Sequence, residues 1–353
     1  MPEARPPRQP PADTWRYPTR RRTLPAMADQ LLNDLLTIPG VPGREHRIRQ
    51  FILEQVRDLV DDTHMDAMGS LHAVREPRVK KNARKPKHPT RVMIAAHMDQ
   101  IGFLVRHIDD KGFLRLQNVG GFDTRNLFAR FVTVSPKLDD PSHDLVGVMN
   151  PGGKPVHIAG DDEKKKIPEV NDLIVDLGLD ADTVRERVKI GDMVTMAGTV
   201  REVGQTIVSQ AIDNRIACWI AIEALKKLKQ HKCEVHVVFT VQEEVGLRGA
   251  TTAAHRIKPD IGIAVDTTLC CDTPGVPGDM AVAEQGKGAA LTVMDSASIA
   301  DLSLLEEFEA VATKKNIPHQ RSILPRGGTD AGALQRAADG VRTFTLSCPT
   351  RYI

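Results

Sequence analysis

The sequence lacks a charge imbalance, a cysteine framework and any long apolar run. With 48 basic and 46 acidic residues, the formal net charge is +2, which gives no general attraction to nucleic acid or to an anionic membrane surface. The five cysteines are odd in number and have no Cys-x-x-Cys spacing, so neither a disulfide framework nor a zinc ribbon is indicated. No run of about 18 apolar residues predicts a membrane-spanning helix. We therefore expect a cytoplasmic protein without nucleic-acid or membrane partners.

Motifs of two common enzyme classes are also missing. The sequence contains no Gly-x-Ser-x-Gly nucleophile elbow and no glycine-rich phosphate-binding loop, so a serine hydrolase and a kinase are not supported. The segment Lys80–Lys87 is strongly basic, but no aromatic residue is interleaved with its charges. Stacking on aromatic side chains is a large part of single-strand binding, so we interpret this segment as a solvated loop.

Length and residue pattern predict two domains and an N-terminal extension. Residues 1–26 are rich in Pro and Arg and lack an apolar signal region, so we expect a disordered extension. Residues 27–100 and 205–353 alternate helical stripes with apolar strands and predict one α/β domain, whose mixed, mostly parallel sheet has helices on both faces. Residues 101–204 show short β-like runs between turns and predict a small all-β inserted domain. Ser303-Leu304-Leu305-Glu306 predicts a capping box at a late helix.

Two adjacent carboxylates follow an apolar strand in the second α/β part. The run Val235–Phe239 has the pattern of a strand covered on both faces, and Glu243 and Glu244 come just after it. Open α/β sheets bind ligands at such strand ends. A lone Glu-Glu pair is more often a solvated turn. Adjacent side chains point in different directions, however, so one carboxylate can bind a metal while the other accepts a proton.

His97 and Asp99 follow a second apolar strand, Arg91–Ala96. An imidazole supplies a neutral nitrogen ligand, and an acid two residues away can hold the other ring nitrogen and so orient the ring. A lone histidine at a strand end is usually structural. Its combination with an acidic strand end elsewhere favours a functional site.

Asp213 and Asp266 lie at two further element ends. Asp213 opens a helix, where capping is its ordinary role and bridging two cations is the functional alternative. Asp266 directly follows the apolar run Ile261–Val265, so a third strand ends in a candidate ligand. Each of these acids is unremarkable alone, and the prediction depends on their convergence.

His97, Asp213, Glu244 and Asp266 form the predicted metal-binding set. Mixed imidazole and carboxylate ligands suit zinc, cobalt or manganese, and a bridging Asp213 would bring two ions together. Such a pair favours hydrolysis. In that reaction Glu243 would take a proton from a water molecule that attacks a carbonyl and then pass the proton to the leaving amine.

Seven segments occur in an order shared with one family of enzymes. They are Ala96–Phe103, Gly191-Asp192, Ala211–Arg215, Gln242–Ala250, Val265-Asp266, Gly328–Gly332 and Arg351–Ile353. Through them the sequence resembles the M42 family of metallo-aminopeptidases, which includes tetrahedral and glutamyl aminopeptidases and endoglucanase M-like proteins, over about residues 27–353. The resemblance implies a zinc-peptidase-like catalytic domain interrupted by a β-rich dimerisation domain. It also implies a hollow homo-dodecamer, built from dimers, that removes residues from the N-termini of peptides.

The resemblance also implies roles for single residues. His97 and Asp266 would hold one metal ion, Glu244 would help to hold a second, and Asp213 would bridge them. Two divalent ions per subunit are therefore expected, with zinc or cobalt preferred and manganese as a further option. Asp99 would orient His97, and Glu243 would be the general base.

Two departures from the family's pattern affect these expectations. Gln100 stands where many members have Glu, which removes a charge from the cleft but no ligand. The family continues Arg-Tyr-Ile with a histidine that completes the second metal site and then a final helix, whereas this sequence ends at Ile353. From this we expect a truncated chain, or a second ion that is held weakly and an activity that depends on added metal.

Two alternatives to an aminopeptidase stay open at the sequence level. One is a related metal-dependent deacylase of N-acyl amino acids. The other is a catalytically impaired assembly subunit, which the missing histidine suggests. The metal content per subunit distinguishes these classes, since an enzyme of either kind would bind about two ions and an assembly subunit one or none.

Overall fold

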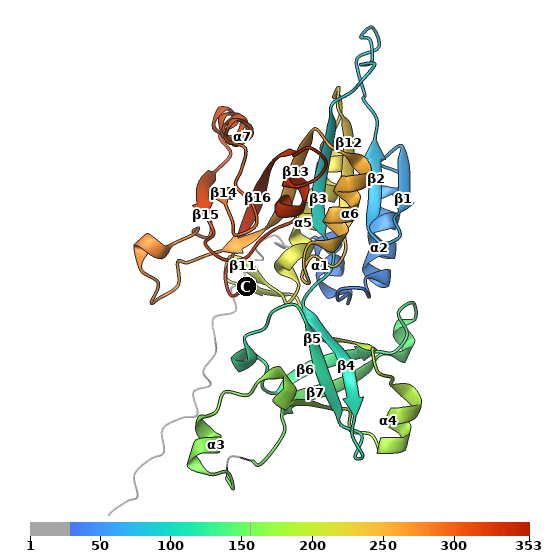
Figure 1. Ribbon diagram of the computed structural model, residues 1–353, viewed down its shortest axis with the longest axis vertical. Helices are drawn as coiled ribbons and strands as arrows, with labels where there is room; N and C mark the ends of the chain where they lie inside the picture. Colours follow the sequence, from blue (N-terminus) through green and yellow to red (C-terminus); the bar gives the residue numbers. More distant parts are fainter. Residues whose placement is uncertain (1–28, 156) are drawn as a thin grey trace, which may run out of the picture.

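The computed structural model describes residues 29–155 and 157–353, which form an α/β layer structure and a β-barrel (Figure 1). The predicted extension, residues 1–26, lies outside the described residues. In Figure 1 the barrel lies below the α/β layers, and the chain enters it after β3 and returns before α5. The predicted fold class, an α/β fold with an inserted all-β part, is confirmed.

One eight-stranded mixed sheet organises the α/β part. Its four central strands are parallel to one another, and antiparallel pairs join β2 to β12, β1 to β2 and β14 to β16. The strand order is β1 (Asp62–Met65), β2 (Leu71–Arg75), β12 (Glu234–Thr240), β3 (Arg91–His97), β13 (Ile261–Leu269), β16 (Arg342–Thr350), β14 (Ala289–Met294) and β15 (His319–Ile323).

Apolar strands occupy the centre of this sheet because both of its faces are covered. In β12, four consecutive residues from Val237 to Thr240 are buried, and in β13 the run from Gly262 to Thr268 is buried without interruption. The edge strand β1, with sequence Asp-Thr-His-Met, is instead partly exposed. Side chains such as Asp62 make an edge strand a poor partner for unwanted pairing.

Helices cover the sheet on two faces. Each face of the sheet packs against its own set of helices and forms its own hydrophobic core. Strand β12 contributes to both, because Val235, Val237 and Phe239 pack on one face and Val238 packs on the other. The first set is α1 (Gln30–Thr37), α2 (His46–Val56), α5 (Ile212–Lys227) and α7 (Leu302–Lys314). The second set is α6 (Arg248–Ile257) and α8 (Ala331–Gln335).

The capping box predicted at Ser303 is wrong, because helix α7 begins one residue earlier and is capped by another side chain. The helix begins at Leu302, and the capping side chain is Asp301, whose carboxylate accepts a hydrogen bond of 2.8 Å from the backbone N–H of Leu304. Asp301 is also held by the guanidinium of Arg342 at 3.1 Å. A carboxylate fixed in this way caps more strongly than a serine hydroxyl, which explains why the helix starts earlier.

The inserted part is a closed six-stranded barrel. Strand β7 shows why it closes around an apolar interior, because Leu145, Gly147 and Met149 are buried while Val146 and Val148 are exposed. The strand order is β4 (Gly102–Ile108), β5 (Leu114–Val119), β8 (Leu173–Asp176), β7 (Leu145–Pro151), β6 (Arg130–Ser135) and β9 (Met193–Met196). Two short helices, α3 (Asp161–Lys165) and α4 (Ala181–Arg187), flank it, and the hairpin β10 (Arg201–Val203) and β11 (Thr206–Val208) follows.

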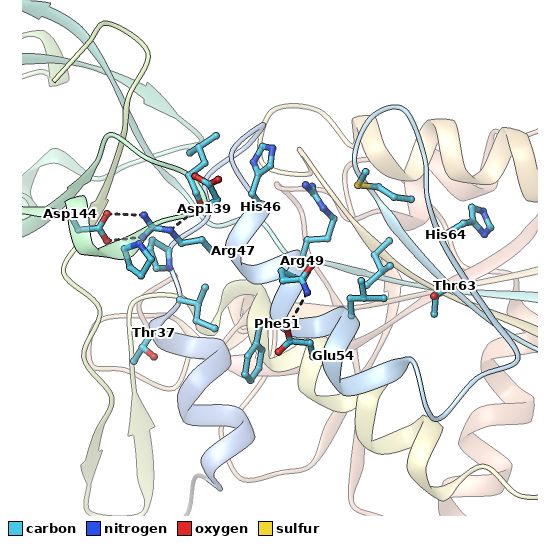
Figure 2. A pocket seen from close by; sticks show the side chains of 18 residues that line it. Thr37, His46, Arg47, Arg49, Phe51, Glu54, Thr63, His64, Asp139 and Asp144 are labelled. Atoms are coloured by element: carbon cyan, nitrogen blue, oxygen red, sulfur yellow. Dashed lines mark hydrogen bonds and ion pairs between the residues drawn. The ribbon is translucent and has the colours of Figure 1, made fainter. Parts of the chain in front are cut away.

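An ion pair ties the barrel to helix α2. Arg47 donates two hydrogen bonds to the carboxylate of Asp144, at 2.7 and 2.9 Å, and a third to the carbonyl of Leu138 at 3.0 Å. Beside this contact lies a cavity of about 860 Å³ between α2, β1 and the loop that precedes β7 (Figure 2). The described residues contain no helix of the length and apolarity that crossing a membrane would require.

Candidate metal centre

The ends of β3 and β12, a residue within β13 and the start of α5 meet at a single edge of the central sheet; the predicted strand end at Asp266 is wrong, because β13 continues to Leu269. His97 is the last residue of β3, and its register partner in the neighbouring strand β12 is Thr240, which precedes the turn that carries Glu243 and Glu244. Asp266 lies in β13, on the other side of β3. Because parallel strands end at the same edge, residues far apart in sequence come together here.

His97 is the centre of this group. Its Nε2 atom lies 3.2 Å from Oδ1 of Asp213, 3.8 Å from Oε2 of Glu243 and 3.8 Å from Oδ1 of Asp266. Glu244 is also close to this ring, since one potential ligand atom from each of His97, Asp213 and Glu244 lies within 4.8 Å of the other two. The structure thus brings together every residue of the predicted metal-binding set and the predicted base.

The ligand atoms divide into two overlapping groups. One consists of His97, Glu243 and Asp266, and the other of His97, Asp213 and Glu244. Asp266 and Glu244 thus fall in different groups, as the predicted roles require, but the residue common to both groups is His97, and Asp213 is grouped only with Glu244. The grouping also places Glu243 close enough to the first group to be either a ligand or a base, so its role as base stays a prediction.

Asp99 acts mainly on the Glu243-Glu244 turn. Its carboxylate accepts hydrogen bonds from the backbone N–H groups of Glu243 and Glu244, at 3.1 and 3.2 Å. Nδ1 of His97 lies 3.1 Å from the backbone carbonyl oxygen of Asp99 and 3.6 Å from its carboxylate. The ring is therefore oriented mostly by the main chain of Asp99, while the side chain fixes the two glutamates.

A glycine allows helix α6 to pack under this turn. A Cβ atom added to Gly249 would lie 2.5 Å from the carbonyl oxygen of Val241 and 2.6 Å from its nitrogen. Backbone atoms cannot move aside cheaply, so only glycine fits at position 249. The close approach holds the turn between β12 and α6 and directs Glu243 toward the site.

Helix α5 is anchored by two residues that follow Asp213. Asn214 donates a hydrogen bond of 2.9 Å to the carbonyl of Val265, next to Asp266. Arg215 is fully buried and donates to the carbonyls of Leu35 and Ile38, both at 2.8 Å. Sequence reasoning included both residues in a motif but gave them no role.

The buried guanidinium of Arg215 also contacts Gln100. Its Nη2 lies 3.2 Å from Oε1 of Gln100, and the described residues give it no carboxylate within ion-pair distance. Burial lowers the pKa of Arg215 to about 10. The group thus remains a cation at neutral pH and holds the start of α5 against the loop between α1 and α2.

Several carboxyl groups of the site lie close together and are largely shielded from solvent, which shifts their pKa values. Burial first, and then repulsion by Asp213, raises the pKa of Glu244 to about 8, while burial raises that of Asp266 to about 6. The pKa of Glu243 is raised well above its ordinary value, mainly by burial. Burial lowers the pKa of His97, but attraction by Glu243 and hydrogen bonds to carboxylates outweigh this and raise it strongly. The cluster therefore favours a positive charge at its centre.

The donor atoms fit divalent transition metals. Oδ1 of Asp213 is buried and makes no well-formed hydrogen bond to any described residue, although it lies 3.2 Å from Nε2 of His97. A carboxylate oxygen left in this state is poorly stabilised unless a cation takes the place of the missing donor. One imidazole with several carboxylates is a ligand mixture that suits zinc, cobalt or manganese.

Two further buried carboxylates adjoin the site and were missed by sequence reasoning. Glu45 accepts hydrogen bonds from the N–H groups of Gly43 and Gln242, and burial raises its pKa to about 7. Asp330 is buried beside Thr240, and burial raises its pKa to about 7 as well. Asp330 belongs to a motif noted in the sequence, but its pattern gave no sign of burial.

The large cavity in Figure 2 is separate from this cluster. It lies along α2, with Phe51 and Arg49 on its wall, and none of the predicted site residues lines it. The candidate metal centre instead consists of residues at the end of β3, in the turn after β12, within β13 and at the start of α5.

Comparison with known proteins identifies sequences and structures of the same kind. The profile of the family described as M42 glutamyl aminopeptidase matches residues 78–353. The lysyl aminopeptidase of Pyrococcus furiosus is 34% identical, over 92% of this chain and 89% of that protein. Among solved structures, aminopeptidase APDkam598 of the archaeon Desulfurococcus kamchatkensis has a TM-score of 0.83 and 33% identity, and covers 92% of this chain and 87% of its own.

A second solved structure carries information on assembly. The TET1 peptidase of Pyrococcus horikoshii has a TM-score of 0.78 and 31% identity, over 92% of this chain and 91% of its own. It is described as able to assemble into a tetrahedron or a large octahedral shell. This chain spans about nine-tenths of each of these three proteins.

Proposed function

Because the chain belongs to the M42 glutamyl aminopeptidase family of hydrolases, we propose that it is a two-metal aminopeptidase that releases residues from the N-termini of peptides. The observation that carries this proposal is the convergence of His97 with carboxylates from three separate elements around Nε2 of its ring. Family membership supports the activity, and the cluster supports the place where it occurs.

His97 and Asp266 would hold one divalent ion, and Glu244 would hold a second, with Asp213 shared between them. The grouping of His97 with Asp266, and of Asp213 with Glu244, supports the two separate sites, while the bridging role of Asp213 is the specific proposal. Metal ions bound there would supply Lewis-acid activation of a carbonyl group and would lower the pKa of water. Imidazole and carboxylate ligands favour zinc or cobalt, with manganese as the third candidate.

Glu243 is the proposed general base. Its backbone is fixed by the carboxylate of Asp99, and its own carboxylate lies 3.8 Å from Nε2 of His97. In this position it takes one proton from the attacking water and returns that proton to the amine nitrogen as the peptide bond breaks. Burial excludes bulk water from the carboxylate, so the proton stays available for the leaving group.

The barrel is the proposed self-association module. Phe131 and Val148 face each other across β6 and β7 on its outer surface, and Val146 lies two residues along the same face. These side chains are exposed by 63%, 39% and 67% respectively. An exposed apolar strand face of this kind is suited to a protein interface, and the assembly described for the TET1 peptidase supports a homo-oligomer, with a dodecamer built from dimers as the specific proposal.

The cytoplasm is the proposed location. All five cysteines are free thiols in the structure, and Cys218 is fully buried, where burial raises its pKa to about 12. Unpaired thiols are typical of proteins from a reducing compartment.

Metal removal and replacement test the proposed function. The full chain is stripped with a chelator, then supplied with excess zinc, cobalt or manganese, and assayed on a panel of aminoacyl amides. Release of the amino acid only after metal is restored supports the proposal. Full activity of the stripped protein, or no activity with any of the three metals, contradicts it.

A further inference from the structure

Asp330 is a buried carboxylate to which the proposed reaction gives no role. It is 2% exposed and stands immediately before α8, yet its side chain does not cap that helix. Oδ2 accepts a hydrogen bond of 2.6 Å from the hydroxyl of Thr240, and Oδ1 has no partner among the described residues. Burying a carboxylate without a partner for both of its oxygens costs free energy of folding, so we expect a role that accounts for the burial of Asp330.

Thr240 is placed where it can transmit this contact. It is the last residue of β12 and the register partner of His97, and its carbonyl accepts a hydrogen bond of 2.9 Å from the N–H of Met98. Three residues later the chain reaches Glu243. The hydroxyl bound by Asp330 therefore lies at the point where β12 ends and the glutamate turn begins.

Asp330 is itself held in a fixed position. The preceding residue, Thr329, donates a hydrogen bond of 2.9 Å to the buried carboxylate of Asp295, and its hydroxyl lies 2.8 Å from that of Thr345 in β16. These contacts anchor the loop before α8 to a central strand. The loop is thus held in place by its own contacts and meets Thr240 through the hydrogen bond to Asp330.

We propose that Asp330 is a positioning residue, which acts through Thr240 to hold the end of β12 and so sets the Glu243 turn against His97. The inference rests on the proposed function for its effect on catalysis, but the effect on the turn is independent of any activity. Asp99 fixes the turn from the side of β3, through the amides of Glu243 and Glu244. Asp330 fixes it from the side of α8, at the root of the turn.

Hydrogen exchange of the metal-free full chain tests the positioning role directly. Asp330→Ala and Thr240→Val each remove the hydrogen bond, and Thr240→Val does so with little change in shape. We expect amides in peptides that cover residues 239–247 to exchange about tenfold faster in both variants. Ser322→Ala, which removes another buried hydroxyl contact of 3.2 Å in β15, is the matched control and should leave these peptides unchanged. Unchanged exchange at residues 239–247 in both test variants would overturn the proposal.

Kinetics separate the hydrogen bond from the charge of Asp330. With metal restored, Asp330→Ala and Thr240→Val should lower kcat about tenfold at unchanged KM and metal content, because a misplaced base slows the chemical step. Asp330→Asn keeps an acceptor for Thr240 and should stay within about threefold of the original kcat. The Thr240→Val/Asp330→Ala double variant should be no slower than either single variant.

Two kinetic results would contradict the proposal. Loss of kcat in Asp330→Asn as large as in Asp330→Ala would mean that the charge, and not the hydrogen bond, is what matters. Losses that multiply in the double variant would mean that Thr240 and Asp330 act separately. If the original chain releases no amino acid, the proposed function fails, while the exchange measurement still decides whether Asp330 holds the turn.

Discussion

The carboxylate of Asp99 accepts a hydrogen bond of 3.1 Å from the backbone N–H of Glu243. This bond joins the end of β3 to the turn after β12, and a second bond of 3.2 Å to the N–H of Glu244 completes the connection. A carboxylate that accepts two main-chain donors fixes the direction of both glutamates at once. The proposed division of roles, with Glu243 as base and Glu244 as metal ligand, would therefore depend on Asp99, to which the proposal gives neither role.

Glu243→Gln tests the role of the base. Glutamine keeps the size of the side chain but cannot accept a proton, so turnover should fall by at least about a hundredfold while folding and metal content stay nearly unchanged. Steady-state kinetics and metal analysis of the purified variant measure both quantities. Loss of a metal ion with activity retained would show that Glu243 is a ligand instead.

Asp213→Asn tests the shared ligand. In the proposed site a single bridging carboxylate would serve both ions, so the variant should lose both together when titrated against zinc by calorimetry. Asp192→Asn provides a comparison, because Asp192 is a partly buried carboxylate that binds the N–H of Lys189 and lies outside the cluster. Selective loss of one ion from Asp213→Asn would mean that Asp213 does not bridge.

The buried side chain of Glu45 should make the free energy of unfolding depend on pH. Burial, and then repulsion by Asp99, raises its pKa from 4.5 to about 7, so the folded protein holds a proton here that the unfolded chain releases near pH 4. The contribution of this proton to the free energy of unfolding is complete below about pH 4 and is lost as pH rises to about 7.

Glu45→Gln removes this titration but keeps an acceptor for the N–H groups of Gly43 and Gln242. The metal-free variant should therefore unfold at a higher temperature than the original chain at pH 8 and at a similar temperature at pH 4, with a difference on the order of 3 kcal/mol at most. Thermal unfolding at the two pH values measures this. An equal change at both pH values would show that Glu45 is not protonated in the folded state.

Val146→Glu tests the proposed interface. If the proposed barrel face forms the interface, a charge at the exposed Val146 should break the proposed oligomer into smaller species without unfolding the barrel, because this side chain is not part of the barrel interior. Light scattering coupled to size-exclusion chromatography gives the mass. Val203→Glu, at an exposed position of β10 outside the barrel, is the control and should leave the mass unchanged. An intact oligomer of Val146→Glu would place the interface elsewhere.

The meeting of the candidate ligands could be predicted from sequence because it follows from a general property of parallel sheets. The apolar runs that precede His97, Glu243 and Asp266 lie in neighbouring parallel strands, so the residues that follow them meet at one edge whatever the loops do, even though β13 continues past Asp266 to Leu269. The fold class followed from the same patterns. The inserted all-β part was indicated by short β-like runs such as Leu145–Val148 between turn residues, whereas its closure into a barrel and the alternating burial along β7 are seen only in the structure.

The supporting contacts could not be predicted, because they depend on side-chain directions rather than on period or spacing. Nothing in the sequence shows that Nδ1 of His97 meets the carbonyl of Asp99 while the carboxylate turns to the glutamates. The burial of Asp330 likewise depends on how α8 packs against β13 and β16. At α7, the motif at Ser303 was a plausible cap, but Arg342 of a distant strand holds Asp301 in the capping position.

The most direct test of the central claim compares two peptides that differ only at the N-terminus, one with a free amine and one acetylated. Each peptide is incubated with the metal-supplemented full chain, and the products are analysed by mass spectrometry. An aminopeptidase should shorten the free peptide one residue at a time from its N-terminus and leave the acetylated peptide intact. Removal of the acetyl group without shortening, or cleavage of neither peptide with any of zinc, cobalt and manganese, would contradict the account.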